Sequence, residues 1–204
     1  TSLTFTNSNW STPQTVTVTG VNDAYLVDGD QTFDVTVSVD DAASDDSYDS
    51  VSDKTVGVTN EDDDSAGISI THTGGDTTVT EGASPGTDTF KVILSGQPLT
   101  DVVIGVSSAD ATEVLVSSGN TLTFTNGNWD IEQTVTVEGV DDNLDDGDQS
   151  TNITLEVNNA SSDDAFDGVS ETAAVTTTDD DTTGFTIAET GGGTIVAENG
   201  SSDT

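Results

Sequence analysis

The chain repeats itself at a spacing of about 118 residues, and this repeat limits the possible folds more than any other feature of the sequence. The segment LTFTNSNW at residues 3–10 returns as LTFTNGNW at residues 122–129. The match continues further along the chain. The segment QTVTVTGVND at residues 14–23 recurs as QTVTVEGVDD at residues 133–142, and SDDSYDSVS at residues 44–52 recurs as SDDAFDGVS at residues 162–170. A repeat of this length has the size of a domain, so each unit should have its own core, unlike the short units of a solenoid.

The repeat divides the 204 residues into one complete unit and two partial units. We expect residues 1–65 to be the C-terminal half of a β-sandwich repeat, residues 66–183 to be a complete repeat, and residues 184–204 to be the N-terminal strands of the next one. Each partial unit lacks strands that a sandwich needs, so we expect neighbouring copies to complete it. An export signal would then lie outside this sequence.

Apolar and polar residues alternate with a period of two in the complete unit, as in FKVIL at residues 90–94 and ITLEV at residues 153–157. This pattern is typical of half-buried β-strands. The strands are separated by Gly, Pro, Asn and Asp, and no segment has the spacing of an amphipathic helix. Seven to nine short strands predict an all-β, immunoglobulin-like sandwich of two sheets. The expected segments are residues 67–70, 77–82, 90–94, 102–106, 112–116, 122–124, 135–137, 153–157 and 172–177.

The charge of the chain is almost entirely negative, with 39 acidic and 2 basic residues, one histidine and no cysteine. Two carboxylates about 5 Å apart repel by roughly 1 kcal/mol in bulk water and by about 3 kcal/mol at an effective dielectric constant of 20. Crowded acids such as GVDDNLDDGDQS at residues 139–150 therefore need bound cations or very high salt. The charge argues against nucleic acid and anionic lipid as partners, and no apolar run is long enough to cross a bilayer.

Four acidic positions of the complete unit fall in loops that should meet at one end of the sandwich, because successive loops alternate between its two ends. These positions are Glu81, Glu113, the cluster at residues 141–148 and the run at residues 179–181. Oxygen ligands without histidine or thiolate favour calcium, which takes six to eight oxygens, over zinc. The sequence therefore predicts a site for calcium (Ca2+), with two or more ions.

The same residues resemble the Calx-beta domains, which occur in the regulatory region of sodium/calcium exchangers, in integrin β4 and in tandem bacterial surface proteins. The resemblance covers the complete unit and rests on VTEG at 79–82, FKVILSG at 90–96, GNTLTF at 119–124, VDDNLDDGD at 140–148 and DDD at 179–181. It implies the calcium ligands Glu81, Glu113, Asp141, Asp142, Asp146, Asp179, Asp180 and Asp181. The version with LTFTxxNW and VDGDQ is most similar to repeats of very large bacterial adhesins.

The predicted metal site also includes Asp148, from the same cluster, and counterparts in the two partial units. The counterparts are Asp23, Asp28, Asp62, Asp63, Asp64 and Glu198. The preceding unit has Asn22 in place of Asp141 and Val27 in place of Asp145, so its site should bind calcium more weakly. We expect no catalytic residues.

The linkers between units are very short, since only Ser65 and Ala66 lie between Asp64 and the next expected strand. Bound ions would therefore lie beside the following unit and hold the two units in line. We expect an extracellular structural repeat of a cell-surface adhesin or fibre, stiffened by calcium at its junctions. Its partners would be neighbouring repeats of the same chain or copies of itself in a filament, without membrane insertion.

The main alternative is an acidic surface-layer or filament protein of a halophile, in which the charge has no specific calcium role. That function predicts acids along the outward faces of strands, where this chain has mostly threonine, as in QTVTVTG. Ice binding by threonine arrays is a weaker alternative because the runs are short. An enzyme is not expected: paired carboxylates occur in glycosidases, but these acids recur in every unit. Trp10 and Trp129 also recur, and we interpret them as anchors of a loop rather than as a sugar-binding platform.

Overall fold

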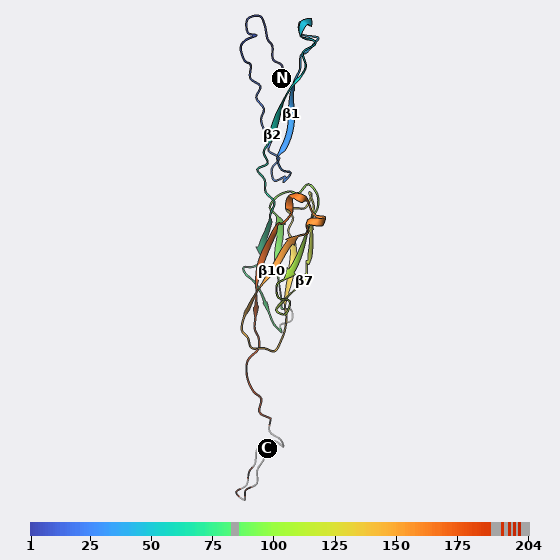
Figure 1. Cartoon of the computed structure of the whole chain (residues 1–204). Coiled ribbons are helices and arrows are strands. Elements are labelled where there is room, and N and C mark those ends of the chain that lie inside the picture. The colour runs from blue at the N-terminus through green and yellow to red at the C-terminus, as the bar shows by residue number, and fades with distance from the viewer. Residues whose placement is uncertain (83–85, 189–192, 194–195, 197, 199, 201–204) are drawn as a thin grey trace.

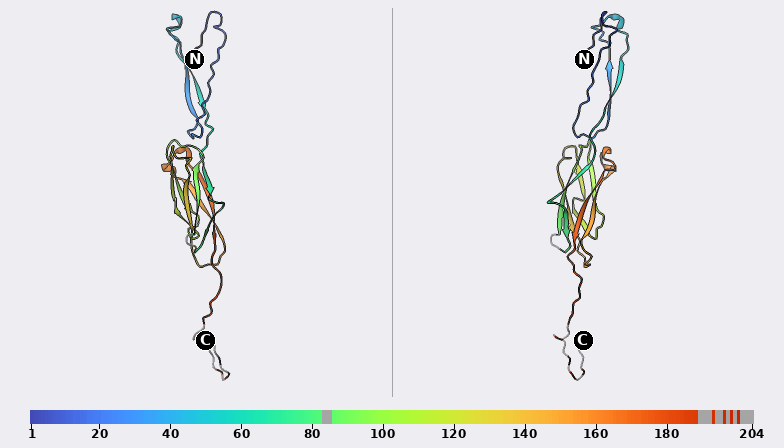
Figure 2. Two further views of the ribbon diagram at one scale, coloured as in Figure 1. Left: turned by 180° about the vertical axis from the view of Figure 1, so that it is seen from behind. Right: turned by 90° about the vertical axis from the view of Figure 1, so that its left-hand side faces the viewer.

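The computed structural model describes residues 1–82, 86–188, 193, 196, 198 and 200. Its strands form three sheets (Figure 1). Two strands of the preceding unit, β1 (Gln31–Val37) and β2 (Lys54–Asn60), pair as an antiparallel ribbon. Figure 2 shows this ribbon at one end of a sandwich, and the chain leaves the sandwich at the opposite end. None of the helices in the described part of the chain is long and apolar enough to cross a membrane.

The other nine strands form the sandwich of the complete unit, and they confirm the predicted all-β, immunoglobulin-like class. One sheet has the order β3 (Ile68–His72), β5 (Thr87–Leu94), β9 (Gln133–Gly139) and β7 (Val114–Ser118). The other has the order β4 (Thr77–Thr80), β11 (Ser170–Thr178), β10 (Gln149–Val157), β6 (Val102–Ser108) and β8 (Thr121–Phe124). Three single 3-10 turns, at Asp46–Tyr48, Asn159–Ser161 and Asp164–Phe166, complete the elements of the described residues.

The chain changes sheets between β3 and β4. Gly74 and Gly75 both have positive φ angles, 84° and 123°, which glycine adopts without steric cost, and they lead the chain from the first sheet to the second. There β4 pairs with β11 in parallel, with Thr80 opposite Thr178. Because both strands run in the same direction, the residues that follow them emerge at the same pole of the sandwich.

The core consists of the inward side chains of both sheets. Phe90, Val135 and Leu155 are fully buried, and their outward neighbours are mostly threonine or acid, as the period-two pattern predicts. Burial of one such side chain is worth about 1.5–3 kcal/mol. The 3-10 turn at Asp164–Phe166, which follows β10, adds the buried ring of Phe166 to the core.

The same sequence positions are open to solvent in the preceding unit, where the opposing strands are absent. Val37 is 47% exposed and Val56 is 60% exposed, whereas their counterparts Leu155 and Ala173 are 0% and 1% exposed. The ribbon therefore has an apolar face that the strands of a complete unit would cover. The division into units at residues 65 and 183 remains a proposal.

Candidate metal centre

The parallel pairing of β4 and β11 brings Glu81 to the acidic run that ends the unit. The backbone N–H of Glu81 donates to the carbonyl of Thr178, at 3.1 Å. One carboxylate oxygen from each of Glu81, Asp180 and Asp181 lies within 4.8 Å of the others. Such a spacing suits oxygens that share one cation. Residues a hundred positions apart in the sequence thus meet at the predicted pole.

Two further acidic loops reach the same pole. The backbone N–H of Val140 donates to the carbonyl of Glu113 at 2.9 Å, which holds the start of β7 against the loop at residues 140–148. The charges of Asp142 and Asp146 act on both Glu81 and Glu113. A hollow of about 350 Å³ opens beside them, lined in part by Glu113, Asp146 and Gln149.

Three of these carboxylates place an oxygen where neither solvent nor a hydrogen-bond donor reaches it. The atoms are Oε2 of Glu81, Oε2 of Glu113 and Oδ2 of Asp181. Glu81 as a whole is only 3% exposed. An isolated buried carboxylate is very costly, and the cost is relieved by a proton or by a cation. The donor set, oxygen throughout and strongly anionic, fits calcium rather than zinc.

Electrostatics at the pole favour protonation when no cation is bound. Burial, together with the charges of Asp142 and Glu113, raises the pKa of Glu81 from its ordinary value of 4.5 to about 7. Burial also raises the pKa of Glu113, with the charge of Asp146 as the next cause, and the pKa of Asp181, with the charge of Asp180 as the next. A group of acids that each resist ionisation is the arrangement expected where carboxylates share a bound cation.

Gly82 leaves room for this cluster. Its φ angle is +57°, and a Cβ atom at this position would lie 2.6 Å from Oδ2 of Asp180 and 3.1 Å from Oδ1 of Asp141. The glycine of VTEG thus lets two carboxylates approach the backbone beside Glu81. The sequence alone did not assign this role to Gly82.

Some of the predicted ligands bind backbone groups of the acidic loops. Asp179 accepts from the N–H of Gly147 at 2.7 Å and from the N–H of Asp181 at 2.8 Å, while its own N–H donates to Asp148 at 3.3 Å. Asp142 accepts from the N–H of Leu144 at 2.7 Å. Asp179 and Asp148 therefore tie the loop at residues 140–148 to the end of β11, which positions Asp180 and Asp181.

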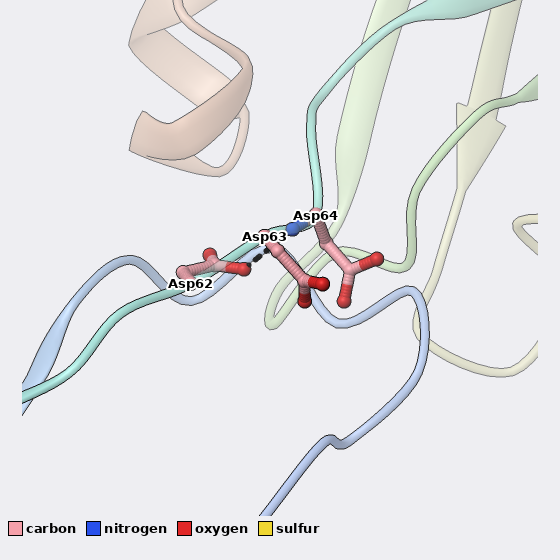
Figure 3. Close-up of side chains that lie close together, drawn as sticks. All are labelled: Asp62, Asp63 and Asp64. Carbon is pink, nitrogen blue, oxygen red and sulfur yellow. Dashed lines mark hydrogen bonds between the residues drawn. The ribbon is translucent and has the colours of Figure 1, made fainter. Parts of the chain in front are cut away.

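The preceding unit repeats this arrangement with Asp62 in the place of Asp179. Asp62 accepts from the N–H of Gly29 at 2.7 Å and from that of Asp64 at 2.8 Å, the interaction drawn in Figure 3. Asp62, Asp63 and Asp64 offer oxygens within 4.8 Å of one another, and Oδ2 of Asp64 is buried without a hydrogen-bond partner. Burial raises the pKa of Asp64, and the negative charge of Asp23 adds to this effect.

The acids of the preceding unit's pole are less buried than Glu81. Asp23 and Asp28 line a hollow of about 330 Å³ together with Asp62 and Asp63. Residues 1–64 contain no counterpart of Glu81, the most buried acid of the complete site. Glu198, the counterpart in the C-terminal segment, is exposed.

Asp110 is an acid of this pole that sequence reasoning missed. Its charge adds to the raised pKa of Glu113, and it lines the same hollow. Its own carboxylate accepts from the N–H of Thr112 at 2.9 Å, so Asp110 shapes the turn before β7. Residues 1–64 hold no copy of this segment, so repetition could not reveal it.

Comparison with known proteins finds similarity only among solved structures. No protein-family model matches the chain, and no curated protein matches its sequence. Among solved structures the chain is similar to an apo-form Calx CBD1 domain, with 24% identity over 56% of this chain and 98% of that domain, at a TM-score of 0.39.

Two other solved structures are similar over different lengths. Domains 1–6 of the surface layer protein SbsC match 78% of this chain and 17% of that one, with 23% identity and a TM-score of 0.39. The chaperone DraB of E. coli matches 58% of each chain, with 8% identity and a TM-score of 0.41. Each likeness concerns the arrangement of strands alone.

Proposed function

We propose that the complete unit is a calcium-binding structural repeat, with its ions at the pole where β4 and β11 end. The observation that carries the proposal is the set of three buried, unpartnered carboxylate oxygens on Glu81, Glu113 and Asp181. Asp180 lies within ligand distance of two of these residues, and Asp142 and Asp146 bring further charge. No basic side chain compensates them, because the chain has only two, and the lysine of this unit, Lys91, pairs with Glu132.

Calorimetric titration of calcium into the full chain, after chelation and dialysis, tests this proposal. We expect more than one ion to bind, with dissociation constants of about 10⁻⁴–10⁻³ M or tighter, as in extracellular calcium modules. An equal concentration of magnesium should compete poorly, because magnesium keeps most of its water and prefers an octahedral shell. No binding at 10 mM calcium, an upper limit set about tenfold above the weakest of these constants, would exclude a calcium function.

We further propose that the repeat acts mechanically, as a spacer on a cell surface or in a fibre. The acidic run follows the last strand of a unit, β11, and in the proposed division the next unit begins two residues later, so an ion bound there would lie at the junction. Neutralised carboxylates would let neighbouring units pack in line, whereas ionised carboxylates without calcium would repel one another. An extracellular position would give weak sites access to calcium.

Small-angle X-ray scattering of the chain measures this mechanical effect. The maximum dimension should be larger and better defined in calcium than in chelator, because the segments on either side of the complete unit are then held in line. Magnesium at the same ionic strength provides the control for simple charge screening. A curve that is identical in calcium, magnesium and chelator would contradict the mechanical proposal while leaving calcium binding intact.

A further inference from the structure

The loop at residues 20–31 differs from its counterpart at residues 139–149 by one additional residue. The sequences are GVNDAYLVDGDQ and GVDDNLDDGDQ, so the preceding unit has one residue more beside Tyr25 and has Val27 where the complete unit has Asp145. Ala24 and Tyr25 both have positive φ angles, 44° and 77°, which residues other than glycine rarely adopt. A loop in this conformation needs contacts that hold it there.

Those contacts cross from the preceding unit to the complete unit. The N–H of Val27 donates to the carbonyl of Gln97 at 3.0 Å, and the N–H of Gln97 donates back to the carbonyl of Tyr25. Together these bonds form an isolated parallel bridge between Leu26 and Gln97. The N–H of Val27 and the carbonyl of Tyr25 thus both hydrogen-bond to Gln97, in the turn after β5.

The side chains on both sides of the bridge complete the contact. Val27 is 7% exposed and belongs to the hydrophobic core of the complete unit, and the ring of Tyr25 packs on that of Trp129 with their centroids 5.7 Å apart. Trp129 is half-buried and also packs against the core of the complete unit. Gly96 makes the close approach possible, because a Cβ atom there would lie 2.5 Å from Cγ2 of Val27 and 2.9 Å from the carbonyl of Ser65.

We propose that Tyr25–Val27 is an inter-repeat clamp that docks on a surface formed by Gly96, Gln97 and Trp129 of the next unit. The clamp precedes Asp28 and Gly29 directly, and Asp62 holds the N–H of Gly29. One loop therefore lies both in the acidic pole of the preceding unit and in the core of the following one. Calcium at residues 62–64 orders the clamp through this loop, a second step that rests on the proposed calcium function.

The corresponding loop of the complete unit differs from the clamp in sequence. It has no inserted residue, and Asp145 stands in place of Val27 and accepts from the N–H of Thr183. The loop sequences therefore predict two kinds of junction: one with an apolar residue, Val27, at the docking position and one with an acidic residue, Asp145, in its place.

Tryptophan fluorescence tests the clamp directly, because in a Trp10→Phe background Trp129 is the only tryptophan. Quenching by acrylamide should be weak in this parent and stronger in calcium-free buffer than in calcium. Tyr25→Ala and Gly96→Ala should each raise quenching toward the level of Trp10, measured in a Trp129→Phe background. Gly127→Ser is the matched control: it lies in the adjacent loop, its new Cβ atom would be 4.0 Å from Oγ1 of Thr125, the nearest atom beyond the adjacent residues, and it has Ser8 as its counterpart.

A second measurement does not depend on fluorescence. Since the chain has no cysteine, the double variant Leu26→Cys with Gln97→Cys, at the two residues of the isolated bridge, should form a disulfide in mild oxidant, while Leu144→Cys with Gln97→Cys should not. Equal quenching of Trp129 in the parent, Tyr25→Ala and Gly96→Ala, or no disulfide in the first pair, would overturn the clamp. If quenching of Trp129 is the same with and without calcium while calorimetry still detects calcium binding, only the proposed ordering of the clamp by calcium is overturned. A failure of calcium binding itself would leave the comparison of variants in calcium-free buffer intact.

Discussion

Replacing Glu81 with glutamine should abolish the stabilisation of the complete unit by calcium. In calcium-free buffer Glu81→Gln should melt at a higher temperature than the parent, because the amide carries no charge to bury beside Asp142 and Glu113. In calcium the melting temperature of the parent should rise and that of the variant should not, because the variant lacks the most buried ligand. Melting followed by calorimetry or circular dichroism, in chelator and in calcium, measures both differences.

The expected gain is large. At a calcium concentration of about 100 times the dissociation constant, one ion adds about 2.7 kcal/mol to the free energy of unfolding. For a small domain, 1 kcal/mol shifts the melting temperature by about 4–8 °C. The parent should therefore melt roughly 10–20 °C higher in calcium. Equal gains in the parent and in Glu81→Gln would contradict the assignment of Glu81 as a ligand.

The dependence on pH gives this experiment an internal check. The pKa of Glu81 is raised to about 7, so the folded chain holds this proton more tightly than the unfolded chain does. The resulting stability is present in full below about pH 4.5, the ordinary pKa, and is lost as the pH rises through 7. Without calcium, the melting temperature of the parent should fall between pH 5 and pH 8, and it should fall less in Glu81→Gln.

A control variant and a comparison in calcium separate this effect from that of net charge. Glu156→Gln removes one negative charge from an exposed position on β10, far from the pole, and should change neither the calcium gain nor the slope with pH. In calcium the parent should show the opposite slope, because calcium binds the ionised carboxylates and competes with protons.

The strands could be predicted from the sequence because the alternation of apolar and polar residues indicates which side chains face the core. In β9, Val135 and Val137 are fully buried and Glu138 is exposed, as the pattern QTVTVEG predicts. The pattern does not state which strand lies next to which. The change of sheet at Gly74 and Gly75, and with it the parallel pairing of β4 and β11, follows from long-range packing of the whole unit.

The acids of the pole could be predicted because a sandwich sends alternate loops to the same end. Glu81, Asp180 and Asp181 were found in this way, but the sequence could not distinguish them from Asp179. All four are acids in loops, and only the backbone geometry shows that Asp179 is hydrogen-bonded to two N–H groups. The clamp at Tyr25 was missed for a related reason, since a single inserted residue has no meaning until its partner, Trp129 of the next unit, is known.

Gly82→Ala should weaken calcium binding by obstructing the site rather than by removing a ligand. The new Cβ atom would lie 2.6 Å from Oδ2 of Asp180, so this carboxylate must move away from Glu81 and Asp181. Loss of a residue that only hydrogen-bonds to a metal ligand lowers metal affinity by roughly 10- to 100-fold, and displacement of a ligand itself should lower it at least as much. Calorimetric titration with calcium measures the change.

The same substitution also strains the backbone, because alanine at a φ angle of +57° costs about 1–2 kcal/mol. Gly168→Ala is the matched control: its φ angle is +76°, no atom lies within 4 Å of the new Cβ, and it lies at the opposite end of β11. Both variants should lose similar stability in chelator, and only Gly82→Ala should lose affinity. If both bind calcium as tightly as the parent, Asp180 is not a ligand, and the ion must instead lie toward Glu113 and Asp146, on the side of the hollow beside β7.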